Sequence, residues 1–299
     1  MSQYDLVILT QDDFIQPDVV TPFIQQIQHE ESLIVNAVTR KGYRAIRKSW
    51  SDKEFDWYSA RSAIFRSTWD YFERLSEFID TIQLISTKTR LFNSYELFKW
   101  NLDKRYLLNL EEKGVNIVPT KYVQRRESIP LESFINEFQN HTLIIKPAIS
   151  ATAFNTYVVN MDNLTSMEEK FSQLVSSSSM LVQPYQESIT SLGEISYVVI
   201  DGAYSHAIRK LPKKGDFRVQ DDFGGTFVDH QPDAHEIEFA QLAVSKCPER
   251  PQYARVDAIR DNTGSLSLME LELIEPELWF RNCPDGVTKL VDAIVSQLK

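Results

Sequence analysis

Three carboxylates at alternating positions near the C-terminal end constrain the fold of this chain more than any other feature. Asp257 lies in one strand-like segment, and Glu270 and Glu272 lie in the next. The turn signal at 261–264 between them predicts a β-hairpin. Because side chains alternate along a strand, the hairpin places all three carboxylates and Arg255 on one face. The expected pairs are Arg260 with Ser265, Asp257 with Leu268 and Arg255 with Glu270.

Two interpretations of this acidic face are open from the hairpin alone. Asp257, Glu270 and Glu272 would repel one another unless a hard cation such as Mg²⁺ neutralised them. Oxygen-ligand Mg²⁺ sites of this kind normally leave room for nucleotide phosphates. The other interpretation is an ordinary strand face exposed to solvent, because motif matches of this kind include false positives.

Composition excludes several classes of protein. The 299 residues, 42% hydrophobic and 25% charged, are typical of a soluble globular protein with two or three subdomains. A net charge of -10 argues against nucleic acid or an anionic membrane as the main partner. Cys247 and Cys283 form no CxxC pair, so neither a disulfide framework nor a zinc site is indicated. The apolar run Leu6 to Leu9 is too short for a signal peptide, and we expect a cytoplasmic protein.

The first third of the chain predicts a small parallel α/β unit. Strand-like runs occur at 6–9, 32–35 and 63–65, with helical patterns at 21–30 and after Trp69. Ligands gather at the carboxyl ends of parallel strands, and the third strand leads directly into the loop 66–71. The substrate-binding candidates in this loop are Arg66, Ser67, Trp69 and Asp70. The alternative is a plain connection in which Ser67, Thr68 or Asp70 caps the following helix.

Two lysines are candidates for binding an anion. A helix is expected from Ser94 to Lys113, stopped by Gly114, and Lys104 interrupts its apolar stripe. Its side chain either snorkels to solvent or reaches an anion. Lys146 ends a strand at 142–147 and is followed by the small-residue loop 148–153, which suits close approach of a phosphate, although the loop has no glycine.

The next segments offer groups for a nucleotide. A strand from Met180 is broken at Pro184, a second runs from 193 to 200, and Asp201-Gly202 turns into a third. Gln183, Glu187 and Glu194 flank the break and suit an adenine and a ribose. The basic loop 210–220 either contacts phosphates or is a solvated charge run.

In this order the features resemble the ATP-grasp ligases, over about 93–276 for the nucleotide-binding half. The stretch Glu270-Leu-Glu272-Leu-Ile-Glu-Pro276 is similar to the bacterial glutathione synthetase pattern, with Glu272 where that family usually has asparagine. The segments 66–71, 101–106 and 215–218 are most similar to the subgroup that contains the O-ureidoserine cyclo-ligase of cycloserine biosynthesis.

The resemblance implies an ATP-grasp fold, α/β overall and α+β in its nucleotide half. A parallel α/β domain (1–93) would precede a central subdomain (94–186) and a C-terminal subdomain (187–299), whose antiparallel sheets enclose ATP. The implied ATP contacts are Lys104, Lys146 and Lys210 at the phosphates, Gln183 and Tyr185 at adenine, and Glu187 or Glu194 at the ribose. The implied ligands of Mg²⁺, or of Mn²⁺, are Asp257, Glu270 and Glu272. Arg255 would stabilise an oxyanion or pair with Glu270, and Arg218 would serve the phosphates.

The activity implied is an ATP-dependent carboxylate–amine or cyclising ligase for a small amino-acid-like substrate. It would form an acyl phosphate and release ADP and phosphate. A small-molecule kinase on the same fold and a nucleotide-binding regulatory protein without turnover are the alternatives. The partners expected are small molecules, with the chain a monomer or homodimer. Five histidines show no metal spacing and are expected to be structural or on the surface: His29, His141, His206, His230 and His235.

Overall fold

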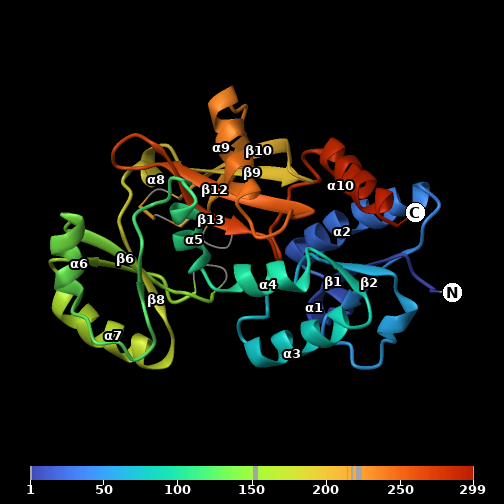
Figure 1. The fold of residues 1–299 in the computed structure, drawn as a ribbon, viewed down its shortest axis with the longest axis horizontal. Helices are drawn as coiled ribbons and strands as arrows, with labels where there is room; N and C mark the ends of the chain where they lie inside the picture. The colour runs from blue at the N-terminus through green and yellow to red at the C-terminus, as the bar shows by residue number, and fades with distance from the viewer. Residues whose placement is uncertain (1, 151–153, 214, 217, 220–223, 299) are drawn as a thin grey trace.

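Three β-sheets follow one another along the chain in the computed structural model, which describes residues 2–150, 154–213, 215–216, 218–219 and 224–298. A parallel sheet comes first, a four-stranded antiparallel sheet second and a five-stranded antiparallel sheet last. The first two lie at opposite ends of the molecule, and the five-stranded sheet lies between them (Figure 1). The boundaries expected at residues 93 and 186 stay predictions.

The N-terminal sheet confirms the small parallel α/β unit. Its strands are β1 (Leu6–Thr10), β2 (Ala45–Ser49), β3 (Ser62–Phe65) and β4 (Arg90–Phe92), in the order β2-β1-β3-β4. Its helices are α1 (Asp12–Ile15), α2 (Pro22–Arg40) and α3 (Leu75–Ser86), with a 3₁₀ turn at Trp57–Ser59.

The strand expected at 32–35 is wrong, because this segment lies inside α2. Thr21 caps that helix through its side chain, and Pro22 occupies its first turn. Ile27, Glu31, Ile34 and Val38 are buried at helical spacing, so the apolar run belongs to one stripe of a long helix. The second strand of the sheet is β2 instead.

The helix expected at 94–113 is broken into α4 (Tyr95–Leu102) and α5 (Tyr106–Glu112). Ser94 caps α4, as expected, by accepting a hydrogen bond from the backbone N–H of Leu97 at 3.1 Å. Asp103 is extended, and the backbone N–H of Lys104 donates to the Ala148 carbonyl at 2.8 Å. Lys104 therefore sits in a connection that is tied to another part of the chain.

The second sheet confirms the strands expected at 142–147 and from Met180 to the break at Pro184. It comprises β5 (Lys121–Val123), β6 (Thr142–Pro147), β7 (Tyr157–Asn160) and β8 (Met180–Pro184), in the order β5-β8-β6-β7. The helices α6 (Leu131–Phe138) and α7 (Leu164–Ser177) pack on one face, where Leu143, Ile145 and Val182 are buried. By strand alternation Ile144, Lys146 and Gln183 face the other way.

The five-stranded sheet has the order β11-β10-β9-β12-β13. Its strands are β9 (Glu194–Ile200), β10 (Ala203–Leu211), β11 (Thr226–Asp229), β12 (Tyr253–Arg260) and β13 (Leu266–Glu272). The short helix α8 (Ser188–Ser191) precedes the sheet. Residues of α9 (Ala234–Ser245) pack on one face against Ile195 and Tyr197. The hairpin expected at Asp201-Gly202 is confirmed, and both residues have positive φ there.

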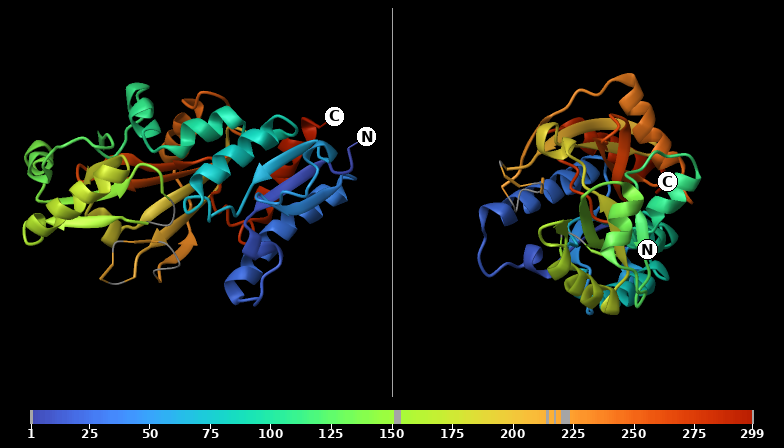
Figure 2. Two further views of the ribbon diagram at one scale, coloured as in Figure 1. Left: turned by 90° about the horizontal axis from the view of Figure 1, so that it is seen from below. Right: turned by 90° about the vertical axis from the view of Figure 1, so that its left-hand side faces the viewer.

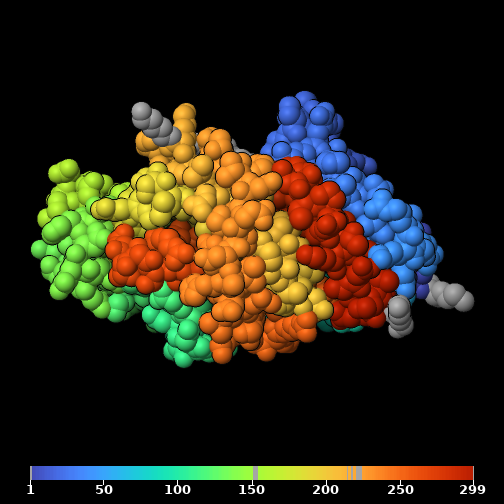
Figure 3. Space-filling view, turned by 90° about the horizontal axis from the view of Figure 1, so that it is seen from above, coloured from blue at the N-terminus to red at the C-terminus, as the bar shows by residue number. Residues whose placement is uncertain are grey.

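Helix α10 (Pro284–Ser296) joins the last sheet to the first unit. It contacts α2 and the strands β9 and β10, and its residues Leu290, Val291 and Ile294 share a core with Leu6 and Val198. The space-filling view shows this helix along the seam between the N-terminal unit and the strands of the last sheet (Figure 3). None of the helices among the described residues combines the length and apolar character needed to cross a membrane.

The carboxylate hairpin forms, but the pairing expected from its turn is wrong. Asp261 pairs with Ser265 through a backbone hydrogen bond, so the loop has three residues and not four, with Gly264 at φ +84°. A bulge at Met269 shifts the register once more, and the pairs are Arg260 with Leu266, Asp257 with Glu270, and Arg255 with Glu272. Two shifts of one residue leave the same side chains on the same face, so the acidic face is confirmed.

Candidate functional site

A cavity of about 270 Å³ opens between the second and third sheets, beside the loop that follows β3. The face of the second sheet that the helices leave free contributes Ile144, Lys146 and Gln183. Trp69 and Tyr71 line the cavity from the N-terminal unit. The third sheet contributes charged side chains from the face opposite α9: Glu194, Lys210, Arg255, Asp257, Glu270 and Glu272. Figure 2 shows the arrangement of the three units from two further sides.

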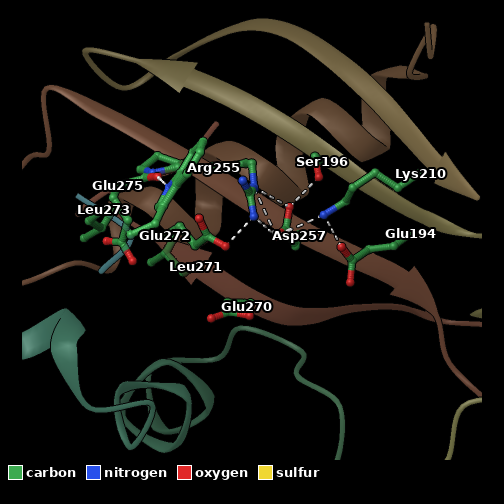
Figure 4. Close-up of polar contacts among 12 residues, drawn as sticks. Glu194, Ser196, Lys210, Arg255, Asp257, Glu270, Leu271, Glu272, Leu273 and Glu275 are labelled. Atoms are coloured by element: carbon green, nitrogen blue, oxygen red, sulfur yellow. Dashed lines mark hydrogen bonds and ion pairs between the residues drawn. The ribbon is translucent and has the colours of Figure 1, made fainter. Parts of the chain in front are cut away.

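Asp257 is the centre of a buried ion network on this face (Figure 4). Its carboxylate is only 2% exposed and accepts hydrogen bonds from Ser196 at 2.5 Å and from Arg255 at 2.9 Å. The Lys210 ammonium lies 3.5 Å away and also pairs with Glu194. Burial alone raises the pKa of Asp257, but the charges of Arg255 and Lys210 outweigh it and lower the pKa to about 2. Asp257 is therefore ionised.

Glu270 faces the two lysines expected to bind phosphate. The Lys104 ammonium lies 3.3 Å from its carboxylate and donates to the Ser150 carbonyl at 2.6 Å. Since the Lys104 side chain is 8% exposed, its snorkelling alternative is wrong. Burial lowers the pKa of Lys146, and the charges of Lys104 and Lys146 lower the pKa of Glu270 against its burial.

Glu272 holds the ion pair with Arg255 that was expected for Glu270. This correction follows from the register, because Arg255 lies opposite Glu272. Burial, together with repulsion from Glu270 and Asp257, outweighs Arg255 and raises the pKa of Glu272 to about 8. The Arg255 guanidinium also stacks 5.4 Å above the Trp279 ring.

The acidic face fits a hard cation better than it fits a solvated strand. Asp257 is buried, and Glu270 and Glu272 border the cavity with side chains 31% and 25% exposed. All three offer oxygen ligands. The pKa of Glu272 is raised first by burial and then by repulsion from Glu270 and Asp257. The described ranges contain no group of three side chains already placed to hold a metal ion. The carboxylates pair with Arg255 and Lys104 instead.

The predicted substrate loop reaches the cavity only in part. Trp69 lines it, while Arg66 and Ser67 line a second, smaller cavity. Asp70 instead accepts a hydrogen bond from the Trp50 indole at 2.8 Å. Arg66 donates to the backbone carbonyl of Pro276. The helix-cap alternative is wrong too, because α3 begins at Leu75, directly after Arg74.

Only some of the residues expected to bind the nucleotide line the cavity. Gln183, Tyr185, Glu194 and Arg218 line the cavity. Gln183 donates to the Thr120 hydroxyl at 2.8 Å, and Arg218 pairs with Asp216 at 2.7 Å. Glu187 is exposed and does not line the cavity. Parts of the two expected phosphate loops lie outside the described residues, namely 151–153, 214, 217 and 220.

Sequence reasoning gave no role to several residues of the cavity wall, among them Tyr71, Glu275 and Trp279. Glu275 belongs to the acidic pattern that ends at Pro276, so the sequence held a signal for it. Burial raises its pKa to about 7, against the lowering effects of Lys104 and of a hydrogen bond with Tyr71. Trp279 has a positive φ of +46°, which no local pattern indicated.

The buried His206 and the partly buried His230 have structural partners. His206 bonds the Leu278 carbonyl through Nε2 at 2.7 Å, and His230 lies 3.2 Å from Glu236. Neither lines the cavity, which agrees with their expected structural role.

Comparison with known proteins identifies the family. Residues 107–257, half of the chain, match the family described as prokaryotic glutathione synthetase, ATP-grasp domain. Residues 6–93 match the N-terminal domain of D-cycloserine synthetase DcsG. The cycloserine biosynthesis protein DcsG of Streptomyces lavendulae is 29% identical over 91% of this chain and 95% of its own length.

Solved structures agree with this assignment. The crystal structure of D-cycloserine synthetase DcsG superposes with a TM-score of 0.86 at 27% identity, covering 98% of this chain and 99% of that one. The ATP-grasp ligase PsnB, complexed with a phosphomimetic precursor variant, Mg and ADP, shares the fold with a TM-score of 0.68 at 14% identity over both whole chains. The predicted ATP-grasp fold is confirmed, and the chain belongs to the ATP-grasp family of ATP-dependent, ADP-forming ligases.

Proposed function

We propose that this chain activates the carboxylate of a small amino-acid-like substrate by phosphoryl transfer from ATP. A carboxylate oxygen attacks the γ-phosphorus, the bond to the bridging oxygen of ADP breaks, and an acyl phosphate forms. A nitrogen then attacks the acyl carbon, loses its proton, and displaces inorganic phosphate. The observation that carries the proposal is that one cavity gathers lysines, Arg255 and the carboxylate hairpin.

ATP would lie across the cavity with its base away from the acidic hairpin. Gln183 and Tyr185 supply the polar and aromatic contacts for adenine, beside Ile144 and Met269. Glu194 is a better ribose candidate than Glu187, because it lines the cavity and Glu187 is exposed. The phosphates would reach Lys104, Lys146, Lys210 and Arg218, each of which borders the same space.

The divalent cation would be held by Asp257, Glu270 and Glu272. When bound, Mg²⁺ supplies charge neutralisation for the phosphate oxygens. Mn²⁺ fits the same oxygen ligands, and we propose it as a substitute. Lys104 and Lys210 would release Glu270 and Asp257 and turn to the phosphates, so these ion pairs hold both sets of side chains in place before ATP arrives.

Arg255 would stabilise the oxyanion of the tetrahedral intermediate. Its guanidinium is held by Asp257 and Glu272 on one side and by the Trp279 ring on another, which limits its orientation. A fixed donor of this type lowers the barrier because little reorganisation is needed when charge develops. Phosphoryl and acyl transfer of this kind need positioning and charge more than a covalent side chain.

The finer alternatives are ligation to a second amine and ring closure within one substrate. The relative DcsG is described as a D-cycloserine synthetase, and the likeness extends over nearly the whole chain. We therefore propose O-substituted serines as the first substrates to examine. We further propose a cytoplasmic monomer or homodimer with small-molecule partners, in line with its net charge of -10.

The test is ADP release by the purified protein with Mg²⁺ and a panel of small amino acids and O-substituted serines. Hydroxylamine is added in parallel, because it converts an acyl phosphate into a hydroxamate. We expect ADP release and hydroxamate with the same substrate, and loss of both in Asp257→Asn. A stable phosphorylated product without hydroxamate would establish a kinase instead. Bound ATP without turnover on any substrate would establish the regulatory alternative.

A further inference from the structure

Glu275 is a buried carboxylate of the cavity wall that lacks a cationic partner. It follows β13, is 9% exposed and lines the cavity. Within the described part of the chain, no lysine, arginine or histidine nitrogen lies within ion-pair distance of it. A buried carboxylate normally has a charged partner, because desolvation is otherwise uncompensated.

The other carboxylates that border the cavity differ from Glu275 in this respect. Glu194 and Asp257 pair with Lys210, Glu270 with Lys104, and Glu272 with Arg255. Glu277 pairs with Arg281. Lys104 influences Glu275 electrostatically, but its ammonium is committed to Glu270 and to the Ser150 carbonyl. Among the described residues Glu275 therefore has a hydrogen bond with Tyr71 but no ion pair, and a bound cation would favour its ionised form.

The walls around Glu275 are aromatic and fixed. The Trp69 indole donates to the backbone carbonyl of Glu275 at 2.9 Å, which ties the loop after β3 to this residue. Tyr71 and Trp279 are 4% and 3% exposed and also line the cavity. Tyr71 also reaches the Glu275 carboxyl through a hydrogen bond. Aromatic rings attract an ammonium group that lies over their faces.

Trp279 carries a second unpaired polar group of the cavity wall. Its indole nitrogen is buried without a hydrogen-bond partner among the described residues. An indole N–H can only donate, and a buried donor without an acceptor is costly. The backbone holds this residue at φ +46°, a conformation rare for a bulky side chain and frequent at functional sites. Glu275 and Trp279 are thus two polar side chains of the cavity wall that have, among the described residues, no ion pair and no acceptor, respectively.

We propose that Glu275, walled by Trp69 and Tyr71, binds the ammonium group of the substrate, and that the Trp279 indole donates to an oxygen of the same molecule. This inference rests on the proposed function and assigns its substrate class as a primary amine bearing the carboxylate to be activated. An ammonium held by Glu275 has no free electron pair, so it cannot attack the acyl phosphate. The subsite would thus select the substrate and keep its own amine out of the reaction.

The test compares amino acids with their desamino analogues, using D-alanine against propionate and D-serine against 3-hydroxypropionate. ADP release is measured for the wild type, Glu275→Gln, Trp279→Phe and the control Glu96→Gln, whose side chain is 64% exposed on α4. We expect the amino acids to be preferred by the wild type. Glu275→Gln should raise their KM by about 10- to 100-fold, with the KM for ATP changed by less than about twofold.

The two substitutions also have readouts that need no turnover. Glu275→Gln keeps the bulk and the hydrogen bond with Tyr71 but removes an unpaired buried charge, so its Tm without substrate should rise. The indole N–H resonance of Trp279, identified by its loss in Trp279→Phe, should shift with D-serine and not with 3-hydroxypropionate.

Equal stimulation of ADP release by amino acids and desamino analogues would overturn the subsite. So would an unchanged KM for amino acids in Glu275→Gln. If neither the amino acids nor the desamino analogues stimulate ADP release, the proposed function fails. The Trp279 resonance then tests by itself whether the ammonium subsite exists. An identical response of that resonance to both ligands, or no response to either, would refute it.

Discussion

Replacing Glu272 by glutamine should stabilise the protein in the absence of divalent cations, increasingly so as the pH rises. Its pKa is raised from 4.5 to about 8 by burial and by neighbouring carboxylates. When folding raises the pKa of a carboxyl, the protonated carboxyl stabilises the folded state at low pH. This contribution is lost as the pH rises from the unfolded pKa to the folded pKa. Glutamine carries no charge at any pH, so the variant lacks this loss.

The size of the effect follows from the two pKa values. From this difference, the Glu272 carboxyl lowers the free energy of unfolding by about 3 kcal/mol at pH 7 and by about 1 kcal/mol at pH 5, relative to a group that stays neutral. Because the Glu272 side chain is 25% exposed, water screens part of this electrostatic effect, and we expect about half of the calculated free energy to be observed. The variant should therefore be more stable than the wild type by about 1.5 kcal/mol at pH 7, a rise in Tm of roughly 3 °C for a chain of this size.

The assay is thermal unfolding in EDTA at pH 5, 7 and 8, with Glu96→Gln as an exposed control. The advantage of Glu272→Gln should grow from pH 5 to pH 8, and saturating Mg²⁺ should reverse it by stabilising the wild type more. A variant less stable than the wild type at pH 7, or a difference that does not change with pH, would refute the reasoning. It would mean that the ion pair with Arg255 dominates the environment of Glu272.

Three further substitutions test other parts of the account. Lys146→Met should raise the KM for ATP by about 10- to 100-fold, read from ADP release, and an unchanged KM would remove Lys146 from the phosphate site. Arg255→Lys should lower kcat by about 10²- to 10³-fold with little effect on ATP binding, because lysine cannot reproduce the guanidinium donors; a kcat within about twofold of wild type would contradict its role. Asn93→Ala removes three buried hydrogen bonds, to the backbone of Gln252, Tyr253 and Leu273, and should lower the free energy of unfolding in urea by about 3 kcal/mol. A decrease below about 1 kcal/mol would show that these hydrogen bonds do not stabilise the fold.

Local patterns predicted the acidic face better than the pairing that forms it. The alternation around Asp257 and Glu270 was enough to place both on one side. The loop length and the bulge at Met269 depend on how the hairpin packs, and together they moved the register by two residues. Because an even shift preserves the face, the error left the candidate site unchanged, although it changed the partner of Arg255.

The errors elsewhere arise where a short run fits two structures or where the tertiary fold decides. The apolar run at 32–35 fits a strand as well as a helix, and the cap at Thr21 and the burial of Ile27 and Val38 decide for the helix. The break before Lys104 depends on its backbone bond to Ala148, which no local pattern contains.

The wall around Glu275 could not be predicted for a similar reason. It brings the loop after β3 against the segment after β13, more than 200 positions apart in the chain. The pattern ending at Pro276 contained the carboxylate, but only the fold shows that it has no cationic partner among the described residues and that the Trp69 indole bonds the backbone carbonyl of Glu275. Sequence reasoning thus predicted the acidic end of the cavity, whereas of its four substrate candidates only Trp69 lines the cavity.

The most direct test of the central claim is the fate of a carboxylate oxygen. The substrate that gives the most ADP is prepared with both carboxylate oxygens as ¹⁸O, and the released phosphate is analysed by mass spectrometry. If the carboxylate attacks ATP to form an acyl phosphate, one ¹⁸O atom should appear in each phosphate released at early turnover. Phosphate without label, or label retained in the product alongside a transferred phosphoryl group, would contradict the account.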